Sequence, residues 1–501
     1  MARILLLPPN RWGRGITALW IPSHTAVLRH RGHEVRLFDC TFFKDWTIGE
    51  TRFNTANRQY RPSDYENQVV FSDAPVANAL WTEIQSFDPD VVFWGAVSSH
   101  IHGEGEYVAI EYGHTLISGL PHPPRAVRIA AGLQPTAAPQ VVAQKFPLID
   151  FFIRGESEYV LAETVESLGT TQRLANIRGL VRREGSAVCI NPPQQMVRMA
   201  DLPPYDYSVF ADQVFLRPYN GRVVRGADFE LSRGCPYTCT YCAETVIQTY
   251  YGFGESINRG VLKGAKQYLR SKGARQIFEE LQRLHEVHGV TFFRIQDTNF
   301  LSIDRDVLLE LTRLITDAGW DIQLYIETRP DGINENTVAL LKRLRVDGVG
   351  MGVEIAAEGF REAHLNRYSP RDRIVNAFRL LRAAGIKRTA YNIIGMPEQD
   401  ESMVLNTIQL NHELDPDNIT VAFYSPLLGT DLQHRGVTIE DFDDYEYNID
   451  AQLRTLTRST NLTKVMLQFY KANFVRLARE GLEKLDELKA EFTESQNTSD
   501  R

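Results

Sequence analysis

Short apolar runs alternate with amphipathic stretches through the first third of the chain. Residues 3–7, 34–38 and 91–97 consist mostly of apolar residues and predict strands, and residues 22–31 between the first two have the apolar spacing of a helix. A further amphipathic stretch covers residues 158–168. This alternation is typical of βαβ units, so we predict a doubly wound parallel sheet with its ligand crevice at the carboxyl ends of the strands.

A second alternation of strand and helix follows a proline-rich stretch at residues 201–206. Its helices are well marked, as in residues 274–288, where Ile277, Leu281 and Leu284 share one face. Strands and helices joined by right-handed crossovers form an open sheet or a curved barrel, and barrel chemistry lies at the carboxyl ends of the strands. Strands are predicted at residues 229–232, 291–295, 321–326, 349–355, 389–394 and 419–424.

These patterns divide the chain into four segments of different character, and the predicted fold class is α/β. The last segment is helical and acidic, and its polar end, from Glu491, has the composition of a disordered tail. The predicted segments are a doubly wound domain at 1–172, a linker with short β pieces at 173–225, the second strand-and-helix domain at 226–430 and a helical segment with a disordered tail at 431–501.

The composition is that of an ordinary globular protein. The chain has 501 residues, 43% of them hydrophobic, and a net charge of -8 from 55 basic and 63 acidic residues. No long Lys/Arg cluster stands out, so we expect no nucleic acid as a partner. No apolar run approaches the length of a membrane span and no signal peptide is visible, so we expect a cytoplasmic protein.

Cysteines carry the most specific chemical signal. Of five in the chain, Cys235, Cys239 and Cys242 form the pattern CxxxCxxC within residues 233–243, directly after a predicted strand. Three thiolates on one loop can hold three irons of a cubane and leave the fourth iron open to a small molecule. A zinc site normally needs a fourth Cys or His nearby, and the next histidine is His285; a disulfide would leave one cysteine over.

On this motif the sequence resembles the radical S-adenosylmethionine (SAM) superfamily, in particular members with an N-terminal cobalamin-binding-type domain. The resemblance covers about residues 1–430. It implies a Rossmann-like first domain, a partial TIM-type (β/α)6 barrel, a [4Fe-4S] cluster held by the three cysteines, and bound SAM that is cleaved to a 5′-deoxyadenosyl radical.

The resemblance also implies roles for residues near the cysteines and at the barrel's strand ends. Tyr241, before the last cysteine, corresponds to the residue whose backbone approaches the adenine. Asp297 resembles the acid that holds the methionine ammonium, since a cationic amine needs an anionic or carbonyl acceptor. Arg329 is placed to pair with the methionine carboxylate, and Glu327 lies beside it.

Two later strand ends complete this set. Glu354 resembles the residue that binds the ribose or carboxylate, and Ile394 belongs to an apolar strand end that packs on the adenine. For each charged residue the plain alternative is a solvated or ion-paired side chain at a strand end. Their common position at strand ends favours the functional interpretation.

The first domain resembles the cobalamin-binding fold in its later part, at residues 131–139 and 153–158. Gly132 stands where the backbone would approach the cofactor tail, and Ser98 and Ser99 match the hydroxyl position at the third strand end. The Asp-x-His-x-x-Gly motif that supplies a lower histidine ligand is missing, as is usual in the radical branch. Two alternatives therefore remain: the domain binds cobalamin, or it keeps the fold without the cofactor.

The function implied is cobalamin-dependent methyl transfer to an unactivated carbon of a small metabolite. A close alternative is radical cyclisation, rearrangement or oxidation without methyl transfer, and an alternative of another class is a non-catalytic metal- or corrinoid-binding module. The expected partners are a small-molecule substrate and an external one-electron donor such as a flavodoxin or ferredoxin.

Overall fold

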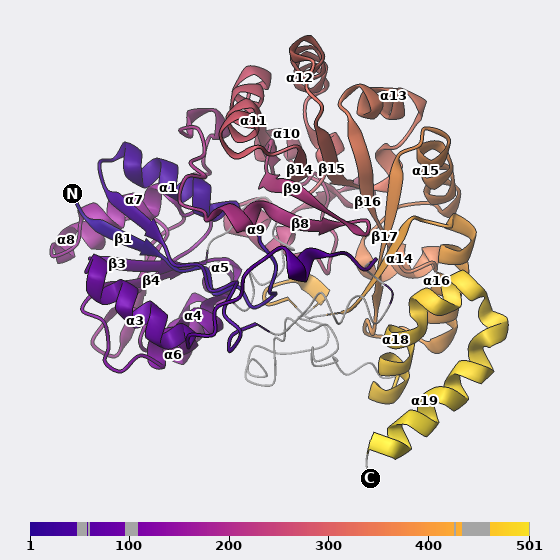
Figure 1. Ribbon diagram of the computed structural model, residues 1–501, viewed down its shortest axis with the longest axis horizontal. Helices are drawn as coiled ribbons and strands as arrows, with labels where there is room; N and C mark the ends of the chain where they lie inside the picture. The colour runs from indigo at the N-terminus through magenta and orange to yellow at the C-terminus, as the bar shows by residue number, and fades with distance from the viewer. Residues whose placement is uncertain (48–57, 59–60, 96–108, 425–426, 433–460, 500–501) are drawn as a thin grey trace.

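The computed structural model describes residues 1–47, 58, 61–95, 109–424, 427–432 and 461–499. Two seven-stranded sheets dominate it, one on each side of the view in Figure 1, with the C-terminal helices at the lower right. The predicted α/β class, with a Rossmann-like domain followed by a partial barrel and a helical C-terminus, is confirmed.

The first sheet has the strand order β2-β1-β3-β4-β5-β6-β7, parallel from β2 to β5 and antiparallel thereafter. Alternate residues of its strands face opposite sides, so Ile4 and Phe93 pack with one set of helices while Leu5 and Val92 pack with the other. Helices α1 and α7 cover one face, and α3, α4 and α6 the other. The strands are β1 (Arg3–Leu6), β2 (Glu34–Leu37), β3 (Val91–Trp94), β4 (Val127–Ala131), β5 (Phe151–Ile153), β6 (Leu180–Glu184) and β7 (Ala187–Ile190); the helices are α1 (Trp20–His30), α3 (Val76–Phe87), α4 (Ala109–Ser118), α5 (Leu133–Ala137), α6 (Pro139–Lys145), α7 (Glu158–Glu166) and α8 (Thr171–Leu174).

The second sheet has the order β18-β17-β16-β15-β14-β9-β8, parallel except for β8 at one edge. Its helices lie outside the curved sheet, as the arc from α11 to α16 in Figure 1 shows. Six parallel strands with one covered outer face form the predicted partial barrel. The strands are β8 (Leu216–Tyr219), β9 (Arg222–Phe229), β14 (Phe292–Ile295), β15 (Gln323–Thr328), β16 (Val346–Glu354), β17 (Lys387–Ile394) and β18 (Asn418–Phe423); the helices are α11 (Ala274–His288), α12 (Arg305–Ala318), α13 (Glu335–Arg343), α14 (Glu358–Leu365), α15 (Arg371–Ala383) and α16 (Glu401–Leu414).

The segment expected to be a linker belongs largely to the two sheets. β6 and β7 extend the first sheet, and β8 pairs with β9 in the second. The first barrel strand ends at Phe229, where it was expected to begin. The sequence pattern of these pieces is too short to reveal which open sheet edge each one joins, because that choice depends on backbone pairing between distant segments.

The C-terminal segment is helical to its described end. α18 (Lys464–Glu480) and α19 (Leu485–Ser499) pack beside β18 and α16, where Phe474, Leu477 and Leu488 are buried. The expectation of a disordered tail from Glu491 is therefore wrong for the residues up to Ser499. Phe492 joins the same apolar cluster, and this packing outweighs the polar composition of the segment.

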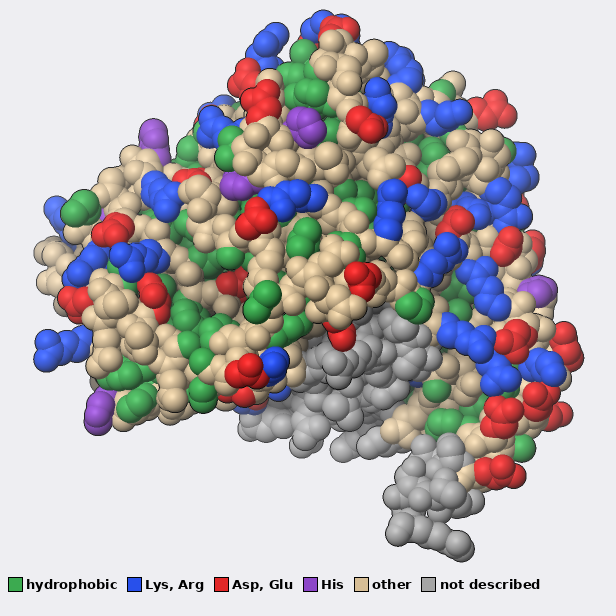
Figure 2. Space-filling model, in the orientation of Figure 1, with side chains coloured by type: hydrophobic (Ala, Val, Ile, Leu, Met, Phe, Trp, Pro, Cys, Tyr) green, Lys and Arg blue, Asp and Glu red, His purple; other side chains and the backbone are tan. Residues whose placement is uncertain are grey.

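The surface shown in Figure 2 carries basic and acidic side chains interspersed with each other. Within the described residues no helix combines the length and apolarity needed to span a bilayer.

Candidate active site

The cysteine loop connects β9 to α9 (Glu244–Tyr250) at the carboxyl end of the first barrel strand. Cys235 and Cys239 are buried and Cys242 is half-buried. α9 fixes the loop: the Glu244 carboxylate accepts a hydrogen bond from the backbone N–H of Cys235 at 3.1 Å, and the Gln248 side chain donates to the Cys235 carbonyl at 3.0 Å. The three thiols are thus held on a preformed loop.

The backbone at position 234 explains why a glycine precedes the first cysteine. Its φ of +99° lies in the region that side chains rarely adopt, and a Cβ there would lie 3.0 Å from the ring of Tyr268. Tyr268, on α10 (Ala265–Tyr268), in turn donates to Glu244. The loop therefore closes over a buried tyrosine that only glycine allows it to approach.

The environment of the thiols fits a cationic group. Burial raises the pKa of Cys235 and Cys242, and the carboxylate of Glu244 and the neighbouring thiols raise it further. Thiolates, the form that binds metals, require compensating positive charge here, which cluster irons supply. Arg329 already contributes one cation, since its Nη1 lies 3.9 Å from the sulfur of Cys239. In the part of the chain that the structure describes, no three His, Cys, Asp or Glu side chains converge on a single-ion site.

Tyr241 and Glu354, predicted from separate parts of the chain, meet beside the cysteines. The hydroxyl of Tyr241 donates to the Glu354 carboxylate at 3.0 Å, and the Arg367 guanidinium lies 3.7 Å from the same carboxylate oxygen. Burial raises the pKa of Glu354, and Arg367 opposes that rise. Glu354 has φ of +60°, an uncommon backbone conformation at the end of β16 that is typical of functional sites.

Arg367 was not identified from the sequence. It follows α14, and its Nη2 also donates to the Gly352 carbonyl at 2.7 Å. A Cβ at Gly352 would overlap the Glu354 carboxylate, so the glycine makes room for this pair. No sequence signal marks Arg367, because it lies in a loop with no strand-end position.

Asp297 and Arg329 are engaged with the protein. The two oxygens of Asp297 accept from the Leu231 N–H at 2.8 Å and the Ser232 hydroxyl at 2.5 Å, and burial raises the pKa of Asp297 to about 7. Arg329 pairs with Asp331 at 2.7 Å. Both residues lie at the cysteine end of the barrel, where they support the loop directly.

Glu327 and Ile394 point elsewhere. Glu327 accepts from the Tyr391 hydroxyl at 2.9 Å in the barrel interior. Ile394 packs into the apolar cluster formed with α16 and α18, whereas Ile393 packs with Tyr241 and Met396. The prediction named Ile394, whereas the structure places Ile393 on the side of Tyr241; neighbouring strand residues face opposite sides, and the sequence does not fix which one faces the cysteine loop.

The first domain presents its strand ends to α9. Gly132, at the end of β4, has φ of +124°, and Leu133 after it packs with Ala243 and Ile247. The side-chain oxygen of Gln134 is buried and has no hydrogen-bond partner among the described residues. Ser98 and Ser99 lie outside the described residues.

A buried ion-pair network joins the two domains immediately before the first cysteine. Arg233 contacts Glu158 at 2.6 Å, Glu230 at 2.7 Å and Glu156 at 3.4 Å. Burial lowers the pKa of Arg233, but these carboxylates outweigh that effect and hold the pKa well above its ordinary value. Glu156 also pairs with Arg270 at 2.8 Å. The network fixes the start of the cysteine loop against the first domain.

Residues 229–410 match the model of the radical SAM superfamily. An uncharacterised methyltransferase from Pyrococcus horikoshii is 24% identical over 355 residues, covering 70% of this chain and 70% of the relative. The anaerobic magnesium-protoporphyrin IX monomethyl ester cyclase from Cereibacter sphaeroides is 25% identical over 418 residues, covering 81% of this chain and 63% of the relative.

Among solved structures, the radical SAM methyltransferase TsrM from Kitasatospora setae, with cobalamin and a [4Fe-4S] cluster bound, aligns with a TM-score of 0.61 and 17% identity. The alignment covers 86% of this chain and 78% of that one. At this identity the likeness concerns the fold alone.

Proposed function

We propose that this chain, whose residues 229–410 match the model of the radical SAM superfamily, is a cobalamin-dependent radical enzyme that transfers a methyl group to an unactivated carbon of a small metabolite. The supporting observation is that Tyr241, on the loop that carries Cys235, Cys239 and Cys242, hydrogen-bonds to Glu354 at the end of β16. When bound there, the cluster supplies the electron that splits SAM into methionine and the 5′-deoxyadenosyl radical.

The surrounding residues bind and orient SAM. Glu354, held by Tyr241 and Arg367, offers a carboxylate that can accept from the ribose hydroxyls or the methionine ammonium. Ile393, on the same side as Tyr241, provides apolar surface for the adenine. Asp297 holds the backbone and hydroxyl at the base of the cysteine loop, and so positions the loop.

Cobalamin is assigned to the strand ends of the first sheet. Gly132 allows close backbone approach, and the buried carbonyl oxygen of Gln134 is an acceptor that a cofactor amide can satisfy. These residues adjoin α9, so a ligand there lies next to the cysteine loop. When bound, cobalamin supplies the methyl group that the substrate radical accepts.

Cyclisation without methyl transfer is the second candidate, favoured by the match to the cyclase over 81% of this chain. Both candidates use the cysteine loop, SAM and an external one-electron donor of the flavodoxin or ferredoxin type. They differ in products: methyl transfer converts a second SAM to S-adenosylhomocysteine, whereas cyclisation yields 5′-deoxyadenosine alone.

The test is anaerobic reconstitution with iron, sulfide and hydroxocobalamin, followed by incubation with SAM and dithionite. We expect iron and sulfide in equal amounts, corrinoid absorbance, and both 5′-deoxyadenosine and S-adenosylhomocysteine. Cys239→Ala should lose the cluster and both products, and Cys189→Ala, on β7, should retain them. Zinc without sulfide in the anaerobic protein would refute the radical chemistry, and 5′-deoxyadenosine without corrinoid binding would refute the cobalamin assignment alone.

A further inference from the structure

A cavity lies in the barrel interior, between the two open edges of the curved sheet. It has a volume of about 220 Å³ and is lined by side chains from β8, β14, β15, β17 and β18. Arg14, Gly15 and Ile16 of the first domain close its side. The edges themselves meet where the Asn418 side chain donates to the side-chain oxygen of Asn220 at 2.9 Å.

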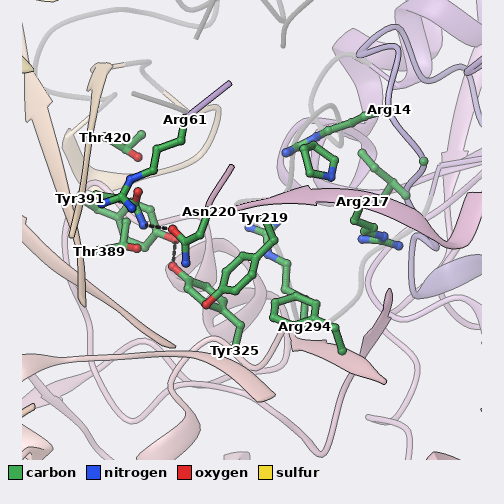
Figure 3. Close-up of a pocket in the computed structure, with 15 residues that line it drawn as sticks. Arg14, Arg61, Arg217, Tyr219, Asn220, Arg294, Tyr325, Thr389, Tyr391 and Thr420 are labelled. Carbon is green, nitrogen blue, oxygen red and sulfur yellow. Dashed lines mark hydrogen bonds between the residues drawn. The ribbon is translucent and has the colours of Figure 1, made fainter. Parts of the chain in front are cut away.

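Four arginines line this cavity, which we call the arginine pocket: Arg14, Arg61, Arg217 and Arg294. Figure 3 shows Arg14 and Arg217 on one side, Arg61 on the other, and Arg294 beside Tyr219 and Tyr325. No Asp or Glu is among the described residues that line it. The lining therefore carries concentrated positive charge, in a protein whose net charge is -8.

Part of this charge is already neutralised by the protein. Arg217 forms an ion pair with the buried Asp228 at 2.6 Å, and Arg294 lies 3.5 Å from the carboxylate of Glu327. Arg61 donates at 3.4 Å to the backbone carbonyl oxygen of Asp417. That carbonyl carries no formal charge and does not neutralise Arg61. Arg61 is the most clearly available cation of the set.

The lining also contains buried donors without acceptors. The Nε of Arg217 and the side-chain NH2 of Asn220 are buried, and neither has a hydrogen-bond partner among the described residues. Buried donors are normally paired, so these two call for an acceptor. Oxygen atoms of a carboxylate or phosphate are suitable acceptors for guanidinium and amide donors.

Two tyrosines of the pocket lining lie against β16, the strand that ends at Glu354. The hydroxyls of Tyr325 and Tyr391 lie 2.8 Å apart, and both rings approach Gly350, where a Cβ would lie 2.6 Å from Tyr391. From Gly348, beside Tyr325, to Glu354 is six residues of strand, or about 20 Å. A ligand that reaches both ends must be elongated.

We propose that the arginine pocket binds the anionic end, a carboxylate or phosphate, of an elongated substrate whose reacting carbon lies towards the cysteine end of the barrel. The position of the reacting carbon rests on the proposed radical function. The anion site rests only on the lining of the pocket. The tyrosine hydroxyls provide hydrogen bonds to the middle of such a substrate.

The test uses inorganic phosphate and acetate as probes, titrated calorimetrically into the full-length protein at low ionic strength. We expect one of them to bind, phosphate more tightly for a phosphate end and acetate more tightly for a carboxylate end. Arg61→Gln should weaken that binding about tenfold, as loss of a charge-assisted hydrogen bond does. Arg294→Lys keeps the charge beside Glu327 and should weaken it less than Arg294→Gln.

Arg373→Gln, at an exposed position of α15, is the matched control and should bind the probe as the parent does. Binding should also persist in Cys239→Ala, which lacks the cluster, so failure of the radical function leaves this test readable. The anion site is refuted if neither probe binds, or if Arg61→Gln and Arg294→Gln bind with unchanged affinity. If the anion binds but no elongated anionic compound raises 5′-deoxyadenosine formation, the assignment to substrate is refuted.

Discussion

Replacing Arg233 by methionine tests how the two domains hold the cysteine loop. The Arg233 side chain is 3% exposed, and its carboxylate partners Glu156, Glu158 and Glu230 are equally buried, at 3%, 1% and 0%. Methionine fills much of the same volume but leaves these carboxylates with fewer cations. Removing one partner of a buried ion pair typically lowers the free energy of unfolding by about 3–5 kcal/mol.

The loss should depend on pH in a defined direction. Although burial raises the pKa of Glu156, Arg270 and Arg233 hold it below its ordinary value. Its ion pairs therefore stabilise the fold above the unfolded pKa and lose that effect as the pH falls through the folded pKa. The deficit of Arg233→Met should accordingly be larger at pH 7.5 than at acidic pH, where protonated carboxyls need no cation.

The assay is urea-induced unfolding of both proteins at the two pH values, followed by circular dichroism. Arg198→Met is the control, since Arg198 is 79% exposed and pairs only at the surface with Asp201. Its change should be within about 0.5 kcal/mol. A loss below about 1 kcal/mol for Arg233→Met, or one independent of pH, would show that the network does not stabilise the domain junction.

Three further predictions concern single residues. Burial raises the pKa of Asp297 to about 7, so its proton stabilises the fold at low pH and this contribution is lost as pH rises from about 4 to 7; Asp297→Asn should flatten that part of the stability–pH curve, and an unchanged curve would contradict the assignment. Glu354→Gln should weaken SAM binding about tenfold in equilibrium dialysis, whereas Tyr241→Phe, which removes only the hydrogen bond to Glu354, should weaken it less; equal effects would argue against direct contact. Gly15→Ala places a Cβ 2.3 Å from the carbonyl oxygen of Val214 and should lower the free energy of unfolding by about 1–3 kcal/mol. The midpoint of thermal unfolding should fall accordingly, and an unchanged midpoint would mean that this contact relaxes freely.

Local sequence patterns account for several features of this protein. The spacing of Cys235, Cys239 and Cys242 identified the cysteine loop, and the alternation of apolar strands with amphipathic helices predicted both α/β domains. The resemblance to the radical SAM superfamily singled out Glu354, and its position at a strand end favoured a functional role. These features depend on residues close together in the chain, and local patterns record them.

Contacts between residues far apart in the chain became visible only in the folded protein. Arg367 joins Tyr241 from 126 positions away, and the arginine pocket combines side chains from the first domain with both edges of the barrel. The sequence also left open whether Ile393 or Ile394 faces the cysteine loop, since strand residues alternate between two apolar environments. Such pairings are set by how strands close into a barrel and how one domain packs on another, and no short stretch of sequence encodes either.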